Sequence, residues 1–209
     1  MNKKTQKLAL SAIMIALATI LSFVKVYQMP YGGSITAFSM VPILFIGYLF
    51  GTKWGLVTGF VYGIIQALLG AFISSAFVGL SIKSVILVFF FDFFMAFTCL
   101  GLSGIFKGKI KNRNFSIGLG AFVATLMRFI AHFISGFVVY GSYAEWFFSQ
   151  STVSFGEKIM SQFSGTSLAM VYSLIYNGSF MIPEIIISII GCIVIFNIPP
   201  VKKIINKGM

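Results

Sequence analysis

The sequence alternates between long apolar stretches and short polar connections. Stretches with the composition of membrane spans occupy residues 8–26, 38–50, 54–71, 84–106, 115–140 and 172–198. An α-helix needs about 20 apolar residues to cross the roughly 30 Å hydrocarbon core of a bilayer. The pattern therefore predicts an all-α integral membrane protein with about six transmembrane helices, forming a single membrane domain over residues 1–209.

The second stretch, 38–50, is shorter than the others and contains Pro42. A helix of this length crosses a bilayer only if it is strongly tilted or if its ends lie in water. Irregular backbone is tolerated at membrane depth where it lines a cavity. We therefore expect this segment to lie beside an internal site.

Basic residues divide unequally between the two sides of the predicted bundle. One side carries Lys3, Lys4, Lys7, Lys53, Lys107, Lys109, Lys111, Arg113, Lys202, Lys203 and Lys207, and the other carries Lys25, Lys83 and Lys158. The positive-inside rule then places both termini in the cytoplasm of a bacterial cell, with the chain in the plasma membrane. The long connections 27–37 and 141–171 lie outside, where they suit a lid over an outward-facing pocket.

Composition supports a membrane protein and excludes several other classes. The chain is 58% hydrophobic and 9% charged, with a mean hydropathy of +1.01 and a net charge of +11. The basic patch at 107–113 is too short for a nucleic-acid-binding domain, and anionic lipid headgroups are its expected partner. Cys99 and Cys192 lie inside apolar stretches and suggest neither a disulfide nor a metal site, and no cofactor is expected.

Four ionisable residues interrupt the apolar spans: Asp92, Arg128, His132 and Glu184. Ionisable groups at membrane depth are costly and are candidates for function. A rise of about 1.5 Å per residue places Asp92, His132 and Asn177 together in the outer third of the membrane. On spacing alone, a lone histidine such as His132 is more often a hydrogen-bonded core residue than a ligand-binding or catalytic one.

Arg128 and Glu184 lie deeper, at similar depths, and are predicted to form a structural ion pair, because a buried charge normally has a partner. A pairing of Arg128 with Asp92 is the alternative. In the first span, Ala12 and Ala16 form a small-x-x-x-small face that permits close contact with another helix. Ordinary packing within the bundle would produce the same pattern.

Three stretches of the sequence resemble the thiamine-specific S components of energy-coupling factor (ECF) transporters. They are 91–97 (FDFFMAF), 128–136 (RFIAHFISG) running on to 140–144 (YGSYA), and 172–178 (YSLIYNG). The resemblance implies a six-helix, S-component-like fold that binds thiamine from outside. It also implies docking on a membrane scaffold subunit and two ATPase subunits, which hydrolyse the ATP.

The resemblance also assigns roles to individual residues. Substrate-binding positions map to Asp92, His132, Tyr140, Tyr172 and Asn177, and the scaffold-docking face maps to Ala12 and Ala16. These residue types suit the ligand. A thiazolium cation favours aromatic faces, and an aminopyrimidine offers a donor to a carboxylate and a further edge to an amide.

The sequence departs from the pattern of that family at several positions. Tyr140 stands where tryptophan is common, Phe93 stands where tyrosine is common, and the acid is the shorter Asp92. The first outer connection has no tryptophan, which leaves Tyr27, Tyr31 or Phe38 as lid aromatics. A related vitamin, or a thiamine precursor or analogue, is therefore an alternative ligand.

Two other functions remain as alternatives. A stand-alone, proton-coupled thiamine carrier would use Asp92 or Glu184 to carry the proton, although the chain is small for a secondary transporter and shows no internal repeat. An intramembrane enzyme is the more distant alternative. The sequence contains neither an H-E-x-x-H pair nor a G-x-S-x-G elbow, and its only histidine is His132, so no catalysis is predicted.

Overall fold

The computed structural model describes residues 2–29, 32–73 and 77–206, the last three of these without their side chains. The elements run in the order α1 (Lys3–Phe23), β1 (Lys25–Gln28), β2 (Ser34–Thr36), α2 (Val41–Phe50), α3 (Thr52–Phe72), α4 (Ile82–Val88), η1 (Phe89–Met95), α5 (Ala96–Thr98), η2 (Cys99–Gly104), α6 (Arg113–Val138), η3 (Gly141–Tyr143), α7 (Ala144–Phe148), α8 (Gly156–Gln162), α9 (Gly165–Asn197) and α10 (Pro199–Asn206).

Among these residues, five helices are long and apolar enough to cross a membrane. They are α1, α3, the continuous helical segment Ile82–Gly104, α6 and α9. Large apolar side chains such as Ile13, Leu68 and Ile186 are more than half exposed on their outer surfaces, as expected where lipid rather than protein is the neighbour. The prediction of an all-α membrane protein is confirmed.

The second predicted span, 38–50, corresponds to α2, which has only 10 residues. Every residue from Val41 to Leu49 is buried by protein. A helix that is apolar on all sides is expected in this position, because it has no polar face to turn to water. At about 1.5 Å per residue it covers only half of the hydrocarbon core.

The last span begins earlier than its hydropathy predicts, at Gly165 instead of 172, and α9 reaches 33 residues. Ser164 and Ser167 form a reciprocal capping box at its start, which satisfies backbone groups that the first turn leaves unpaired. Residues 165–167 are therefore helical, although their polarity kept them out of the predicted span. Tyr172 consequently lies inside a regular helix and not at its start.

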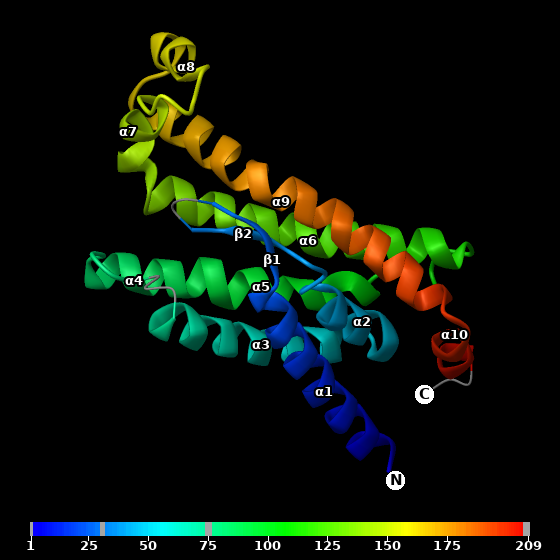
Figure 1. Ribbon diagram of the computed structural model, residues 1–209. Helices are drawn as coiled ribbons and strands as arrows, with labels where there is room; N and C mark the ends of the chain where they lie inside the picture. The colour runs from blue at the N-terminus through cyan, green and yellow to red at the C-terminus, as the bar shows by residue number, and fades with distance from the viewer. Residues whose placement is uncertain (1, 30–31, 74–76, 207–209) are drawn as a thin grey trace.

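The first outer connection contains an element that the hydrophobic pattern does not predict. Strands β1 and β2 pair in antiparallel register, with Lys25 opposite Thr36 and Gln28 opposite Ser34. Figure 1 shows this hairpin lying across the middle of α6 and α9. The hairpin is therefore placed to interact with the helices that carry the predicted site.

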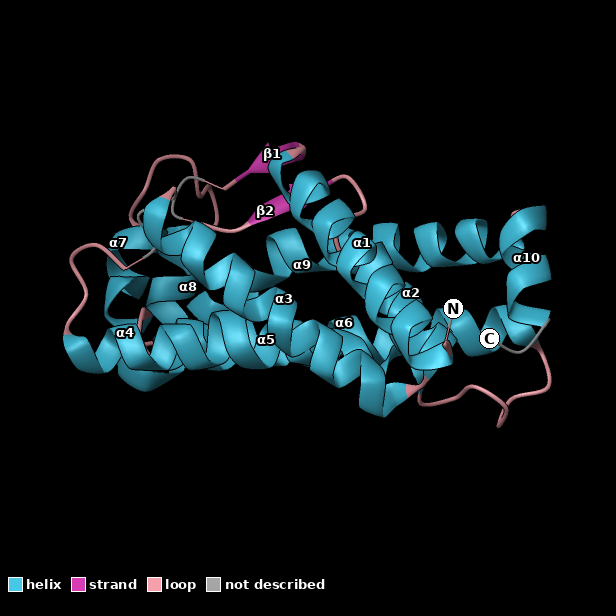
Figure 2. Cartoon of the chain, turned by 90° about the horizontal axis from the view of Figure 1, so that it is seen from below, coloured by secondary structure: helices cyan, strands magenta, loops and turns pink. Residues whose placement is uncertain are grey.

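Helices α6 and α9 run antiparallel as the most extensively packed pair of the bundle, beside a layer formed by α3 and the Ile82–Gly104 helix (Figure 1). The start of α1 and helix α10 lie at one end of the bundle, and α7 and α8 lie at the other end (Figures 1 and 2). In the second layer, a Cβ built on Gly101 would lie 2.1 Å from the backbone nitrogen of Leu56. Only glycine permits this close contact between α3 and η2.

Candidate functional site

Asp92 lies on a stretch of π-helix, η1, in the middle of an otherwise tighter helix. The backbone N–H of Ala96 donates to the carbonyl of Phe91, five residues earlier, which is the bond that defines the wider turn. Such turns insert a residue into the helical repeat and change the direction of the side chains around it. In this protein the wide turn carries the acidic residue that the sequence had singled out.

The Asp92 carboxylate contacts two side chains of α6. Asp92 Oδ1 lies 2.7 Å from His132 Nδ1, and Asp92 Oδ2 accepts a hydrogen bond from Ser135 Oγ at 2.5 Å. The Asp92 side chain is 20% exposed and that of His132 is 12% exposed. The structure therefore brings together two of the predicted site residues and adds Ser135, which sequence reasoning had missed.

Arg128 holds the far side of the histidine ring. Its Nε donates to His132 Nε2 at 3.2 Å, and its guanidinium carbon lies 4.2 Å from the centre of the Phe97 ring. Because Nε2 accepts this bond, the proton of the neutral imidazole is on Nδ1 and is donated to Asp92. Arg128 thereby fixes the histidine tautomer that interacts with the carboxylate.

Arg128 does not form either of the predicted direct ion pairs. Among the described residues, the only acidic and basic groups within 4.0 Å of each other are Asp92 and His132. Glu184 Oε1 instead accepts from the backbone N–H of Thr36 and from Thr36 Oγ1, the latter at 2.7 Å. The predicted Arg128–Glu184 pair is wrong as a direct contact, because the hairpin supplies the donors to Glu184.

Asn177 lies where α9 crosses α6. Its Nδ2 donates to the carbonyl oxygen of Ser173 at 3.0 Å, and its side chain is 7% exposed. A Cβ built on Gly136 would lie 2.6 Å from Asn177 Nδ2 and 2.4 Å from Ser173 Oγ. Glycine at 136 therefore lets the α6 backbone approach the Asn177 amide one turn beyond His132.

Aromatic rings connect the outer end of α9 to the histidine. Tyr172 and Tyr176 both pack on Phe147 of α7, with ring centres 5.2 and 5.7 Å away. Tyr176 also contacts Phe180, whose ring centre lies 6.0 Å from that of His132. Sequence reasoning had identified only Tyr172 of this group. The spacing of Tyr176 and Phe180, four and eight residues after Tyr172, is the signal that indicates a shared helix face.

Tyr140 is half-buried just beyond the end of α6 and lies near the same group. Burial raises the pKa of the Tyr140 phenol to about 12, and the negative charge of Asp92 acts in the same direction. The phenol is therefore neutral at physiological pH. The sensitivity of Tyr140 to Asp92 indicates that the two side chains are in electrostatic range of each other.

The hairpin covers the α9 side of this aromatic group. Tyr176 donates its hydroxyl proton to the carbonyl oxygen of Gly32 at 2.6 Å. A Cβ on Gly33 would lie 2.7 Å from the Phe180 ring. On the hairpin side, the described contacts are therefore made by the backbone of Gly32 and Gly33 and not by an aromatic side chain.

Two of the three predicted lid aromatics, Tyr27 and Phe38, do not lie over the site in the described chain. Tyr27 is 56% exposed on β1. The Phe38 ring packs on Gly191, where a Cβ would lie 2.6 Å away, roughly 20 Å along α9 from Tyr176. Tyr31 lies outside the described residues.

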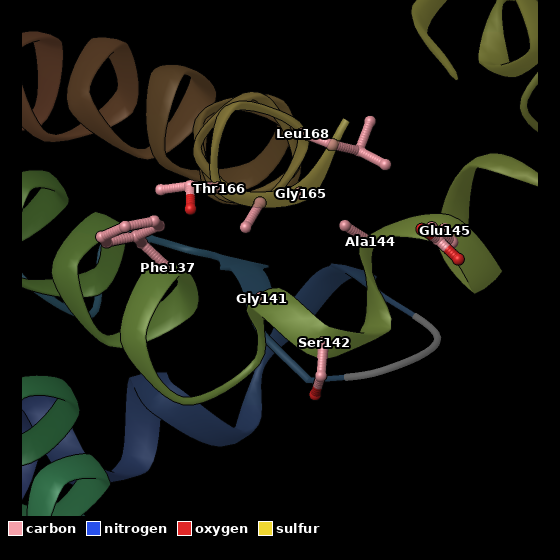
Figure 3. Close-up of a pocket in the computed structure, with 9 residues that line it drawn as sticks. Phe137, Gly141, Ser142, Ala144, Glu145, Gly165, Thr166 and Leu168 are labelled. Atoms are coloured by element: carbon pink, nitrogen blue, oxygen red, sulfur yellow. The ribbon is translucent and has the colours of Figure 1, made fainter. Parts of the chain in front are cut away.

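An open pocket of about 470 Å³ lies at the end of the bundle that carries α7 and α8. Figure 3 shows it between the end of α6, the η3–α7 segment and the start of α9, lined by Phe137, Gly141, Ser142, Ala144, Glu145, Gly165, Thr166, Leu168 and Ala169. The side chains around the carboxylate, Asp92, His132, Ser135 and Arg128, do not line this pocket.

No group of three or more histidine, cysteine or acidic residues in the described chain is arranged to hold a metal ion. The predicted docking residues Ala12 and Ala16 lie on α1, and both are exposed. Their surface is therefore available to another helix, which leaves the docking prediction open.

Comparisons with known proteins match this arrangement. A family model described as thiamine transporter protein matches residues 8–156. This chain belongs to the thiamine transporter protein family. The thiamine transporter ThiT of Bacillus subtilis (strain 168) is 31% identical over 214 residues, covering 97% of this chain and 96% of the relative.

The fold matches a solved structure as well. ThiT from Listeria monocytogenes superposes with a TM-score of 0.69 at 19% identity, covering 95% of this chain and 97% of that one. The resemblance found in the sequence is thus confirmed at the level of family and fold. Membership of a transporter family also agrees with the prediction that the protein is not an enzyme.

Proposed function

We propose that this member of the thiamine transporter family is the S component of an ECF-type importer, which captures thiamine at the Asp92–His132 site. The observation that carries the proposal is the Asp92 carboxylate, which is held by His132 and Ser135 and bordered by aromatic rings. It is an anionic, partly exposed acceptor in a chain whose net charge is +11. A cationic ligand is the chemical partner that this arrangement favours.

The two parts of thiamine suit different parts of the site. His132 and Ser135 each bond one oxygen of Asp92 and so fix the orientation of the carboxylate. The amino group of the pyrimidine would donate to a lone pair that these two bonds leave free. The thiazolium cation is attracted to electron-rich ring faces, and Tyr140, Tyr172 and Tyr176 supply them. Asn177, at the α6–α9 crossing, would read a second edge of the pyrimidine.

Energy for transport would come from partner subunits. The sequence has no G-x-x-x-x-G-K-S/T loop for nucleotide phosphates. Exposed Ala12 and Ala16 on α1 offer a face on which a scaffold helix would pack closely. The positive-inside distribution supports cytoplasmic termini in the plasma membrane, on the side where ATPases act.

Binding and coupling need separate experiments. Quenching of Trp54 and Trp146 fluorescence during titration with thiamine, thiamine phosphate and the free pyrimidine and thiazole halves would test the ligand. Saturable binding of thiamine with weaker binding of either half is the expected result. No response to any of them would remove the proposed site.

Uptake into proteoliposomes, with and without the scaffold and ATPase subunits, would test the coupling. Accumulation that requires ATP and those subunits is expected. Accumulation by this chain alone, driven by a proton gradient, would instead establish the stand-alone carrier.

A further inference from the structure

Glu184 connects α9 to the inner end of the hairpin. Its side chain is 2% exposed, and its two described donors are the backbone N–H and the hydroxyl of Thr36, 148 residues away in sequence. The Thr36 hydroxyl also contacts Ser39 Oγ at 2.6 Å. Because Thr36 donates to the carboxylate, Ser39 must donate to Thr36. A buried charge therefore organises the segment from 36 to 39.

The same face of α9 carries the other hairpin contacts. Tyr176, Phe180 and Glu184 are spaced four residues apart and so lie in line along the helix. Gly32 contacts Tyr176, Gly33 contacts Phe180, and Thr36 contacts Glu184. Residues 32–36 thus follow this face from the aromatic border of the site to Glu184.

Arg128 brings the ligand site into electrostatic contact with Glu184. The Arg128 Nη1 and the Glu184 Oε2 are both buried and have no hydrogen-bond partner among the described residues. The two side chains carry opposite charges, and no nitrogen–oxygen contact between them lies within 4.0 Å. Attraction between opposite charges extends further than this in a low-dielectric interior.

We propose that Glu184 is a positioning residue that couples occupancy of the ligand site to closure of the hairpin segment 32–39. This inference rests on the proposed function, in which a cation binds next to Asp92. In the empty protein, Arg128 is shared between the Asp92–His132 pair and Glu184. A bound cation neutralises Asp92 and repels Arg128, so the attraction of Arg128 for Glu184 increases.

The sign of the coupling follows from this competition. A Glu184 carboxylate that is held more firmly by Arg128 keeps Oε1 in place as the acceptor for Thr36. The hairpin then stays against Tyr176 and Phe180, and the ligand leaves more slowly. Coupling is reciprocal, so loss of the Glu184 charge or of the Thr36 hydroxyl must weaken retention of the ligand.

The test uses full-length protein in nanodiscs and stopped-flow fluorescence to measure the thiamine dissociation rate. Glu184→Gln keeps the side-chain shape and removes the charge, and Thr36→Val removes one donor. Each is expected to raise the dissociation rate by about fivefold or more, the lower limit of common coupling factors. The double variant should be little worse than either single variant, because both changes break one interaction.

Ser103→Ala is the matched control. Ser103 is also a buried hydroxyl that bonds across helices, to the carbonyl of Leu44 at 2.7 Å, but it is remote from the hairpin. The Ser103→Ala substitution should lower thermal stability and leave the thiamine dissociation rate unchanged. A second readout is trypsin cleavage after the exposed Lys25 of β1, which thiamine should slow in wild type and in Ser103→Ala but not in Glu184→Gln.

The outcomes separate this inference from the proposed function. If wild-type protein binds no thiamine, the proposed function fails. If thiamine binds but Glu184→Gln and Thr36→Val keep the wild-type dissociation rate and Lys25 protection, the coupling is overturned. Should Glu184→Gln not fold, Thr36→Val keeps the buried charge and decides the question alone.

Discussion

His132 and Asp92 are 40 residues apart in sequence, on α6 and η1, and their facing atoms lie 2.7 Å apart. Arg128 fixes the opposite nitrogen of the ring, so the histidine donates to the carboxylate and leaves it an acceptor. This relationship sets the expected ligand chemistry. A donor-bearing cation fits, whereas an anion would meet the negative charge of Asp92.

Asp92→Asn should weaken thiamine binding by more than about tenfold, or about 1.4 kcal/mol. The amide keeps the size of the side chain but removes the charge and replaces one acceptor with a donor. Equilibrium titration by intrinsic fluorescence would measure the change. Glu145→Gln, which removes an exposed carboxylate in the outer pocket, is the control and should bind nearly as wild type does. Equal affinities for Asp92→Asn and wild type would place the ligand elsewhere.

His132→Ala should also weaken binding by more than about tenfold. The change removes a donor to Asp92 and leaves the buried Arg128 Nε without its acceptor. In the double variant with Asp92→Asn, the two losses should not add, because the residues act as one unit. Calorimetric titration of the four proteins would give the coupling energy. Full additivity would show that the two residues act independently.

Gly136→Ala should destabilise the protein by roughly 1–3 kcal/mol, the usual cost of forcing atoms into a packed interface. The new methyl group would lie 2.4 Å from Ser173 Oγ and 2.6 Å from Asn177 Nδ2, so α6 and α9 must separate. Thermal unfolding in detergent would measure the effect. Gly118→Ala is matched on the same helix, where the nearest atom is 3.4 Å away, and it should be close to neutral.

Tyr176→Phe should speed thiamine dissociation, because the hydroxyl bond to Gly32 is worth about 1 kcal/mol. Tyr62→Phe is the control. It removes a hydroxyl that bonds a backbone carbonyl, that of Ala18 at 3.2 Å, away from the hairpin. Stopped-flow traces should show faster release for Tyr176→Phe alone. The same acceleration in both variants would assign the effect to general loss of stability.

Ala12→Leu and Ala16→Leu should leave thiamine binding intact and lower ATP-driven uptake by at least about tenfold. A branched side chain on α1 would keep a partner helix from approaching closely. Uptake and binding would be measured on the same preparations. Ile86→Phe, a bulky change at an exposed position of α4, should alter neither. Normal uptake by both alanine variants would exclude this face as the docking surface.

The sequence predicts the spans and the polar residues within them, because a charged side chain in an apolar stretch has few possible environments. Asp92 and His132 were identified in this way, and the structure brings them together. Ser135 and Tyr176 were missed because serine and tyrosine are common in ordinary membrane helices. The π-turn that directs Asp92 toward α6 has no distinct hydrophobic signature.

The environment of Glu184 could not be predicted from its spacing. A buried acid indicates that donors are nearby, and Arg128 is at the right depth to provide them. The structure uses a backbone N–H of Thr36 instead, and backbone donors are invisible to residue-type reasoning. The paired strands of the first outer connection were missed for a related reason, since they are short and all their residues except Thr36 are exposed or half-exposed.

The burial of α2 has a consequence for how the chain enters the bilayer. A helix of 10 residues is too short to be recognised as a span, and its apolar surface is covered only once its neighbours are in place. It leads into α3 through Gly51 alone, at a φ of 90°, as the first arm of a tight helical hairpin. Insertion of this segment is therefore expected to depend on α3, so the two would integrate together during synthesis while α1 enters by itself.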